Sequence, residues 1–299
     1  IPYGCIRNPL RKFANMTMQE ATYYLLNKLT TIYDKSEASQ ITDWVMEKLT
    51  GSKKAKRMIY KNEAITAEEE SLFKKFTERL LQHEPVQYVL NEAWFGNMKF
   101  YVDKNVLIPR PETEELVEWI ISNCKFPIDG LKILDIGSGS GCIPISLKKR
   151  LPKAKVWSCD ISNEALTVAR KNAEDLEQEV NFIQLDFLDQ HSWKQLPMFN
   201  IIVSNPPYIP EKDKKTMQPN VLQYEPGTAL FVPDNDALVF YKAMASFGKT
   251  HLEKDGSIFM EIHENLGKEV TQLFKSTGFS TELKKDMQEK DRMIKAGLA

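Results

Sequence analysis

Four consecutive residues, Asn205-Pro206-Pro207-Tyr208, directly follow the apolar stretch 200–204 (NIIVS), which is typical of a buried strand. A planar amide or exocyclic amine nitrogen is a poor nucleophile because its lone pair is delocalised. The Asn205 side-chain carbonyl and the Pro206 backbone carbonyl could accept hydrogen bonds from both N–H groups of such a nitrogen and aim its lone pair at an electrophile. Tyr208 offers a flat face for a planar group, and the prolines fix the backbone in advance. The tetrapeptide therefore predicts a site that orients a planar nitrogen, with Asn205, Pro206 and Tyr208 catalytic and Asn205–Tyr208 binding the substrate; the alternative is a structural turn.

A glycine-rich segment, residues 135–141 (DIGSGSG), follows an apolar strand and opens a helix. Glycines permit positive φ and close approach of the backbone to a ligand. The dinucleotide fingerprint G-x-G-x-x-G would need a glycine at position 142, which is Cys142. The spacing G-x-G-x-G, with Asp135 two residues ahead, instead resembles motif I of the class I S-adenosylmethionine-dependent methyltransferases. A carboxylate there suits the amino group and cationic sulfonium of that cofactor; the alternative is a tight turn that binds nothing.

Two later acids end the next two apolar segments. Asp160 can accept the ribose hydroxyl hydrogens. Asp186 can meet the adenine amino group, while Phe187 packs on the base. Each acid alone is more often a surface or capping residue, but together they favour a cofactor site. The predicted cofactor-binding residues are Asp135, Gly137, Ser138, Gly139, Ser140, Gly141, Asp160, Asp186, Phe187 and Asn205.

The composition limits the kinds of function. The 299 residues suffice for two domains, and 40 Lys/Arg against 41 Asp/Glu leave a net charge of −1. That balance argues against affinity gained by broad neutralisation of phosphates. No apolar run approaches the roughly 18 residues of a membrane span. The scattered cysteines have no metal-ligand spacing, so we expect reduced thiols, no metal site and a cytoplasmic location.

Prolines and glycines divide the chain. Residues 1–15 lack an initiating Met and an apolar signal core, and we interpret them as a non-native or upstream extension. Residues 16–90 carry almost no proline or glycine and predict a helical bundle, in which Thr66 and Glu69 form a capping box. We expect three apolar helix faces. The first carries Leu72, Phe73, Phe76, Leu80 and Leu81; the second carries Tyr24, Leu25, Leu29 and Ile32; and the third carries Ile41, Trp44, Val45 and Leu49. The basic run 53–57 (KKAKR) is interpreted as a solvated helix face or, less favoured, a partner-docking patch.

Residues 91–110 predict a β-hairpin that links the bundle to a second domain, residues 111–299. A helix is expected from Pro111, and strands and helices then alternate. Such alternation implies a mostly parallel sheet that binds ligands at the carboxyl ends of its strands. The prolines between 197 and 233 predict a rigid loop region. The expected strands are 132–136, 155–159, 180–185, 200–204, 257–262, 281–285 and 292–296, and the expected helices 143–150, 162–175, 266–276 and one from 236.

Further segments occur in a characteristic order: residues 83–88 (HEPVQY), 95–96 (FG) and 107–114 (LIPRPETE), then 225–226 (EP) and 291–292 (DR). Together with DIGSGSG and SNPPYI they resemble the PrmC/HemK family, the peptide chain release factor glutamine N5-methyltransferases. The resemblance covers roughly residues 18–297. Phe187 stands where many members have Trp, the glycine usual before Asp291 is absent, and His263 is interpreted as a loop residue.

The resemblance implies an α/β fold: a Rossmann-like seven-stranded class I methyltransferase sheet with an N-terminal helical bundle and a connecting hairpin. It implies methyl transfer from S-adenosylmethionine to the Gln side-chain amide of the Gly-Gly-Gln motif in a release factor, with the bundle as docking module. Arg110 and Glu112 are implied to border the substrate, a structural ion pair being an equal alternative.

Two other functions stay open. A DNA or RNA amino-methyltransferase would share the NPPY motif, but the near-zero net charge and the absence of a recognisable nucleic-acid module weigh against it. A non-catalytic S-adenosylmethionine-binding protein would not need Asn205 and Tyr208. We expect a monomer that needs no nucleic acid and no membrane.

Overall fold

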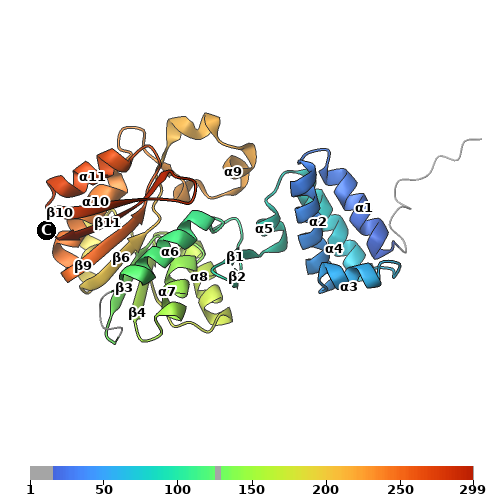
Figure 1. Ribbon diagram of the computed structural model, residues 1–299, viewed down its shortest axis with the longest axis horizontal. Helices are drawn as coiled ribbons and strands as arrows, with labels where there is room; N and C mark the ends of the chain where they lie inside the picture. Colours follow the sequence, from blue (N-terminus) through green and yellow to red (C-terminus); the bar gives the residue numbers. More distant parts are fainter. Residues whose placement is uncertain (1–15, 125–128, 299) are drawn as a thin grey trace, which may run out of the picture. The chain divides into compact units, whose positions relative to one another are not determined.

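The computed structural model describes residues 16–124 and 129–298 (Figure 1). The expected extension, residues 1–15, lies outside this described part. The chain divides into two compact units, one ending at Asn91 and the other beginning at Glu92. Within the described residues no helix combines the length and the apolar composition that crossing a membrane requires.

The first unit is helical, as its scarcity of proline and glycine predicts. Two of its helices begin with a capping box, Thr17 with Glu20 and Thr66 with Glu69, and the second of these confirms the predicted helix start. Leu25, Leu29, Val45 and Phe73 are among its fully buried side chains. Its helices are α1 (Met18–Leu29), α2 (Lys35–Thr50), α3 (Lys54–Ile59), α4 (Ala67–Leu81) and α5 (Val86–Leu90).

Three expectations about this unit are wrong. Leu72 and Trp44 are exposed. On α4 the buried positions are 73, 76, 77 and 80, and Leu72, four residues before Phe76, lies about 40° outside the edge of that stripe. Arg57 does not belong to a solvated face, because it is buried, pairs with Asp43 (2.9 Å) and donates to the Ser52 carbonyl (2.6 Å).

The predicted hairpin is short and belongs to the second unit. Strands β1 (Ala93–Phe95) and β2 (Met98–Phe100) pair antiparallel across Gly96 and Asn97, which both have positive φ. Positive φ at both central residues is what a tight two-residue hairpin turn requires. The inward side chains of the hairpin, such as Phe95, join an apolar cluster that also contains Leu116.

A seven-stranded sheet forms the centre of the second unit (Figure 1). Its spatial order is β10-β11-β9-β6-β3-β4-β5, and strands β9, β6, β3, β4 and β5 run parallel, whereas β11 is antiparallel to both neighbours. The predicted, mostly parallel sheet is therefore confirmed. The strands are β3 (Lys132–Ile136), β4 (Lys155–Asp160), β5 (Asn181–Gln184), β6 (Phe199–Ser204), β9 (Leu252–Glu261), β10 (Phe279–Lys285) and β11 (Asp291–Leu298).

Helices cover both faces of this sheet. Helices α6 (Pro111–Asn123) and α7 (Cys142–Arg150) share one apolar cluster with Ile133, and α10 (Val239–His251) and α11 (Gly267–Ser276) share another with Leu134. Adjacent residues of β3 thus point to opposite faces, as the pleat requires. The chain leaves β3 towards β4 and β5, then returns to β6 on the other side of β3. Ligands of open parallel sheets bind at such a reversal.

The proline-rich region between β6 and α10 contains only short elements. Strands β7 (Ile209–Pro210) and β8 (Phe231–Val232) pair parallel, and α9 (Pro219–Tyr224) lies between them in the chain. Two short 3-10 helices, η3 (Glu211–Thr216) and η4 (Gly227–Ala229), complete the region, and a third, η2 (Gln190–Gln195), precedes β6.

A buried asparagine on α8 (Asn163–Asp175) joins the hairpin to the glycine turn. The Asn172 side chain accepts from the Tyr101 N–H (2.7 Å) and donates to the carbonyls of Tyr101 (2.9 Å) and Ser140 (2.8 Å). Residues 101, 140 and 172 are therefore joined by one buried side chain.

We expect Asn172→Ala to lower the free energy of unfolding by about 3 kcal/mol, because three backbone groups lose their partner inside the protein. Urea denaturation measures the change. Asn163→Ala, at an exposed position of the same helix, is the control and should stay within about 0.5 kcal/mol of the wild type. Equal losses in the two variants would contradict the structural role of Asn172.

Candidate active site

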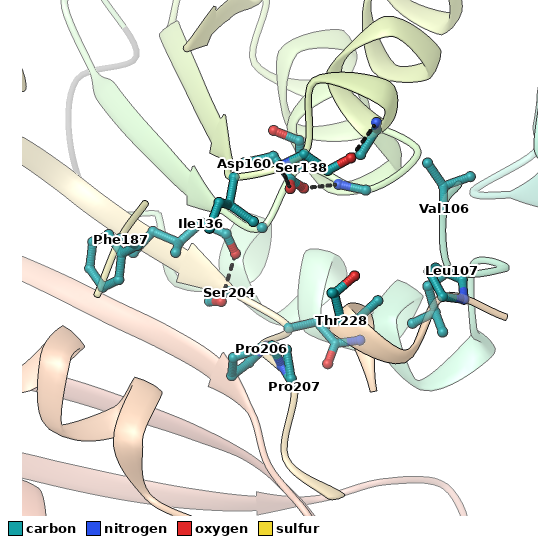
Figure 2. A pocket seen from close by; sticks show the side chains of 18 of the residues that line it. Val106, Leu107, Ile136, Ser138, Asp160, Phe187, Ser204, Pro206, Pro207 and Thr228 are labelled. Carbon is teal, nitrogen blue, oxygen red and sulfur yellow. Dashed lines mark hydrogen bonds between the residues drawn. The ribbon is translucent and has the colours of Figure 1, made fainter. Parts of the chain in front are cut away.

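A cavity of about 420 Å³ lies at the carboxyl ends of β3, β4 and β6. Its volume is in the range of small-molecule sites. Figure 2 shows Ser138 and Asp160 on one side and Pro206 and Pro207 across from them, with Phe187 towards one end. The sequence-predicted residues that line the cavity are Arg110, Gly137, Ser138, Gly139, Ser140, Asp160, Asp186, Phe187, Asn205, Pro206 and Pro207.

Four other predicted residues, Asp135, Gly141, Tyr208 and Glu112, do not line it.

The glycines of the turn serve two different purposes. Gly137 (φ +88°) and Gly139 (φ +50°) face open space, because a Cβ built on either meets no atom within 4 Å. Gly141 (φ +81°) instead begins α7, and a Cβ there would lie 2.9 Å from the Ile145 side chain and 3.3 Å from Ala169. The first two leave room for a ligand against the backbone, and the third permits close packing of two helices.

Asp160 connects the turn to the next helix. Its Oδ2 accepts from the Gly139 N–H (3.0 Å), and its Oδ1 accepts from the Ser162 N–H (2.9 Å). Burial raises the pKa of this carboxyl, and the hydrogen bonds from the backbone oppose that effect. Each oxygen keeps a lone pair that can accept a hydroxyl hydrogen from a ligand in the cavity.

Asp135 acts from behind the turn. Its Oδ2 lies 2.6 Å from Ser158 Oγ, which in turn lies 2.6 Å from Ser138 Oγ. When Asp135 is ionised, Ser158 donates to it, and Ser138 is then the donor to Ser158. The Asp135 Oδ1 is buried and has no hydrogen-bond partner among the described residues. Burial, partly offset by the Ser158 bond, raises the pKa of Asp135 to about 8. A cationic ligand nearby would favour the ionised form of Asp135, whose Oδ1 could then accept a hydrogen bond.

The end of the cavity near β5 is more apolar than the sequence motifs indicate. Phe187 is only 5% exposed, and its ring packs on Trp193 (5.6 Å between centroids) and Phe247 (5.3 Å). Ile161 and Leu188, which follow the predicted acidic and aromatic residues, also line the cavity and are exposed. Neither residue is among the sequence-predicted site residues, although each follows a strand-end motif directly as an apolar residue. They offer the apolar surface that a planar ring needs.

The NPPY residues lie at the opposite wall. Ser204, just before them, donates to the Ile136 carbonyl (2.7 Å), which holds the end of β6 against the end of β3 (Figure 2). Asn205, Pro206 and Pro207 line the cavity. Tyr208 instead donates its hydroxyl to Glu261 Oε1 (3.2 Å), and burial raises its pKa.

Arg110 makes an ion pair, but its partner is Glu225 and not Glu112. The guanidinium lies 2.6 Å from Glu225 Oε1, and Glu225 Oε2 accepts from the Ile108 N–H (3.4 Å). The Glu225 side chain is only 2% exposed. This pair attaches the segment before α6 to the segment after α9, and both segments contribute lining residues.

The sheet order, the glycine turn and the cavity at the strand reversal together define a class I S-adenosylmethionine-dependent methyltransferase. The sequence matches the family "Methyltransferase small domain" over residues 113–224 and "PrmC N-terminal domain" over residues 23–90. The catalytic domain of hMettl16, solved with the MAT2A 3′UTR hairpin 6, shares this fold (TM-score 0.51, 14% identity, 78% of this chain and 83% of that one).

Two curated relatives are named "Release factor glutamine methyltransferase". The Flavobacterium psychrophilum protein is 49% identical over 220 residues, which cover 73% of this chain and 76% of that protein. The Bacteroides thetaiotaomicron protein is 38% identical over 280 residues, which cover 93% and 99%. The chain belongs to the release factor glutamine methyltransferase family.

We expect Gly139→Ala to weaken cofactor binding by roughly tenfold or more, because the new methyl group projects into the cavity and the backbone needs positive φ. Isothermal titration calorimetry with S-adenosylmethionine measures the affinity. Gly278→Ala is a matched control, since its φ is +92° and nothing lies within 4 Å of its Cβ, but it does not line the cavity. Equal affinity in both variants would contradict the assignment of Gly139.

The raised pKa of Asp135 predicts a pH effect on stability. Its folded-state pKa is about 8 and its ordinary value is 3.8, so between these values the folded state holds a proton that the unfolded state has lost. This stability is fully present below about pH 4 and is lost as the pH rises through about 8. Asp135→Asn cannot ionise, so its free energy of unfolding should rise relative to the wild type as the pH is raised.

Urea denaturation at a series of pH values measures this difference. Asp129→Asn, at an exposed position, is the control. A pH slope for Asp135→Asn that matches the wild type would show that Asp135 does not titrate in this way.

Proposed function

We propose that this protein transfers a methyl group from S-adenosylmethionine to the side-chain amide nitrogen of the Gln in the Gly-Gly-Gln motif of peptide chain release factors. The observation that carries the proposal is the match to the Bacteroides thetaiotaomicron release factor glutamine methyltransferase, which spans both units of this chain. The position of Asn205 and Pro206 on the cavity wall supports it, because these residues carry the carbonyls that an amide substrate needs.

The residues of the cavity fit S-adenosylmethionine. Asp160 would accept the ribose hydroxyls, and Asp186 would accept from the adenine amino group, with Ile161 and Leu188 beside the ring. The unpartnered Oδ1 of Asp135 supports a cationic group close to the glycine turn. When bound, the cofactor supplies a methyl group attached to a positively charged sulfur, which is an electrophile.

The protein's contribution is to orient a weak nucleophile. The Asn205 and Pro206 carbonyls would accept both N–H bonds of the Gln amide, which leaves its lone pair directed at the methyl group. The two prolines restrict the backbone before the substrate arrives. The rate gain comes from positioning and electrostatics and does not require a strong base.

The remaining residues and partners belong to the same proposal. The helical unit would dock the release factor, and its match to the PrmC N-terminal domain supports this role. Arg110 and Glu112 would border the substrate, with the Arg110–Glu225 pair fixing the wall. Tyr208, half-buried, would support the substrate amide through its attachment to Glu261. The enzyme would act as a monomer in the cytoplasm, which is where release factors meet ribosomes. It would not require nucleic acid.

One assay tests the proposal. The protein is incubated with labelled S-adenosylmethionine and, separately, with a release factor, its Gln→Ala variant in Gly-Gly-Gln, and bulk tRNA, rRNA and DNA. We expect label on the release factor alone, and none on the variant. Label on nucleic acid, or on the variant release factor, would overturn the proposal in favour of an amino-methyltransferase of nucleic acids or a different protein site.

Asn205→Ala should lower kcat by roughly 10²–10³-fold, because the substrate amide loses an oriented hydrogen-bond partner in the transition state. Cofactor affinity should change by less than about twofold, since the cofactor is held mainly by the glycine turn and the strand-end acids. Single-turnover transfer to a release factor and calorimetry with S-adenosylmethionine measure the two quantities. Loss of cofactor affinity together with activity would show that Asn205 is not a substrate residue.

A further inference from the structure

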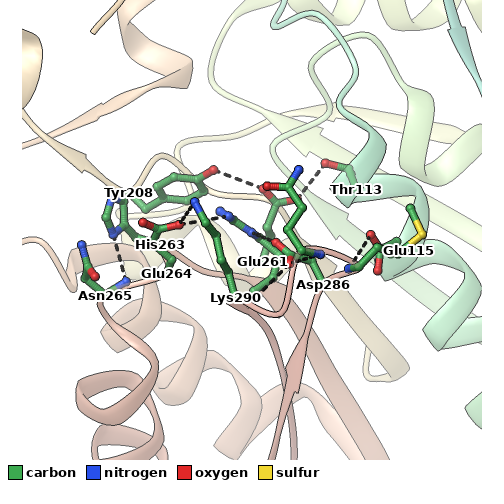
Figure 3. Close-up of polar contacts among 12 residues, drawn as sticks. Thr113, Glu115, Tyr208, Glu261, His263, Glu264, Asn265, Asp286 and Lys290 are labelled. Carbon is green, nitrogen blue, oxygen red and sulfur yellow. Dashed lines mark hydrogen bonds and ion pairs between the residues drawn. The ribbon is translucent and has the colours of Figure 1, made fainter. Parts of the chain in front are cut away.

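A buried carboxylate lies beside the NPPY loop but outside the cavity. Glu261, the last residue of β9, is 2% exposed and does not line the cavity. Figure 3 shows it between Tyr208 and Thr113. The hydroxyl of Thr113 donates to Glu261 Oε2 (2.7 Å), and the hydroxyl of Tyr208 donates to Oε1 (3.2 Å).

Thr113 carries this interaction on to the active site. The Asn205 Nδ2 lies 3.0 Å from Thr113 Oγ1. A threonine hydroxyl has one proton, and here that proton is given to Glu261, so towards Asn205 the oxygen can only accept. The Asn205 amide must therefore turn its NH₂ group to Thr113, which leaves its carbonyl to face the cavity that Asn205 lines.

The opposite orientation of the Asn205 amide is disfavoured because the Thr113 hydroxyl has only one proton to donate. If Asn205 presented Oδ1 to Thr113, the hydroxyl proton would have to serve Asn205, and Glu261 Oε2 would lose its donor inside the protein. A buried carboxylate oxygen without a donor is costly. In the wrong orientation Asn205 would also present N–H groups to the N–H groups of the substrate amide, and these repel.

Glu261 holds both ends of the tetrapeptide. It reaches Asn205 through Thr113 and binds Tyr208 directly, so one side chain fixes the first and the fourth residue of NPPY. The Tyr208 ring has a second support in His263, which it meets edge-on at 5.9 Å between centroids. This geometry gives each end of the loop a fixed position before any substrate binds.

We propose that Glu261, acting through Thr113, is a positioning residue that orients the Asn205 amide with its carbonyl towards the substrate. This inference rests on the proposed function. Glu261 does not touch substrate or cofactor, and it contributes no proton to the reaction. Its effect is on kcat, because the orientation of Asn205 matters most where the substrate nitrogen is aligned for transfer.

The charge state of Glu261 follows from its surroundings. Burial raises its pKa to about 7, and the hydrogen bonds from Thr113 and Tyr208, together with the charge of Arg292, oppose that rise. The other titratable groups that face it are Glu112 on α6 and Tyr241 on α10. A protonated Glu261 can donate to Thr113, which frees the Thr113 proton to turn Asn205 the wrong way. Activity should therefore fall as the pH drops below about 7.

The test compares Thr113→Val, which removes only the hydroxyl, with Thr113→Ser, which keeps it. In the full-length protein with a release factor, we expect Thr113→Val to lower kcat roughly 10- to 100-fold. KM and cofactor affinity should move by less than about twofold, and Thr113→Ser should stay within about threefold of the wild type. Thr277→Val, which removes a partly buried hydroxyl that bonds the Leu273 carbonyl at the end of α11 and does not line the cavity, should leave kcat unchanged.

A second variant keeps the test decisive if Thr113→Val folds poorly. Glu261→Gln can present either an acceptor or a donor to Thr113, so it orients Asn205 less strictly, and we expect a kcat about tenfold lower. Because Gln does not titrate, the kcat of this variant should not fall as the pH drops below 7. Three results would each overturn the inference. They are an unchanged kcat in Thr113→Val, a loss of kcat in Thr113→Ser as large as that in Thr113→Val, and a kcat of Glu261→Gln that still falls below pH 7. The proposed function is tested separately, by the rate at which the wild-type protein methylates the release factor Gln. A wild-type protein that does not methylate this Gln would contradict the proposed function, whereas the variants test the role of Glu261.

Discussion

Burial of polar groups at the carboxyl end of the sheet is the constraint on which the whole site depends. Strands β3, β6 and β9 lie side by side, and their ends carry Asp135, Ser204 and Glu261, all buried. Each must find partners inside the protein. Asp135 takes the Ser158 hydroxyl, Ser204 takes a β3 carbonyl, and Glu261 takes Thr113 and Tyr208. These bonds order the glycine turn on one side of the cavity and the NPPY loop on the other.

The two buried carboxylates act in the same way at the two halves of the site. Neither lines the cavity, and each reaches it through a hydroxyl: Asp135 through Ser158 to Ser138, and Glu261 through Thr113 to Asn205. When the carboxyl is ionised, the hydroxyl beside it donates its proton to the carboxylate, so the group on the other side of the hydroxyl meets an acceptor. Both carboxyls have a raised pKa because burial disfavours their charge. Orientation at this site is therefore obtained at the expense of electrostatic stability.

Local patterns made much of the fold predictable, and long-range contacts explain what was missed. The strand 132–136 and the capping box at Thr66 depend on neighbouring residues alone, and the sequence located both correctly. The hydrogen bonds of Thr113 join residues 92 and 148 positions apart, and no periodicity or motif announces such pairs. Asn172 was missed for the same reason, because its partner Tyr101 lies 71 positions away. The exposure of Leu72 and Trp44 shows that a helical period does not by itself fix the edge of a buried stripe.

The same proton count explains why a neutral amide suits position 205 in this protein. The group there must donate inward, because the only Thr113 proton is given to Glu261, and it must accept on the side of the cavity. An aspartate would bring a second carboxylate to Thr113 with no proton left for it, close to the charge of Glu261. A leucine would satisfy neither demand. An asparagine has a donor at one end and an acceptor at the other, and the buried carboxylate decides which end faces the substrate.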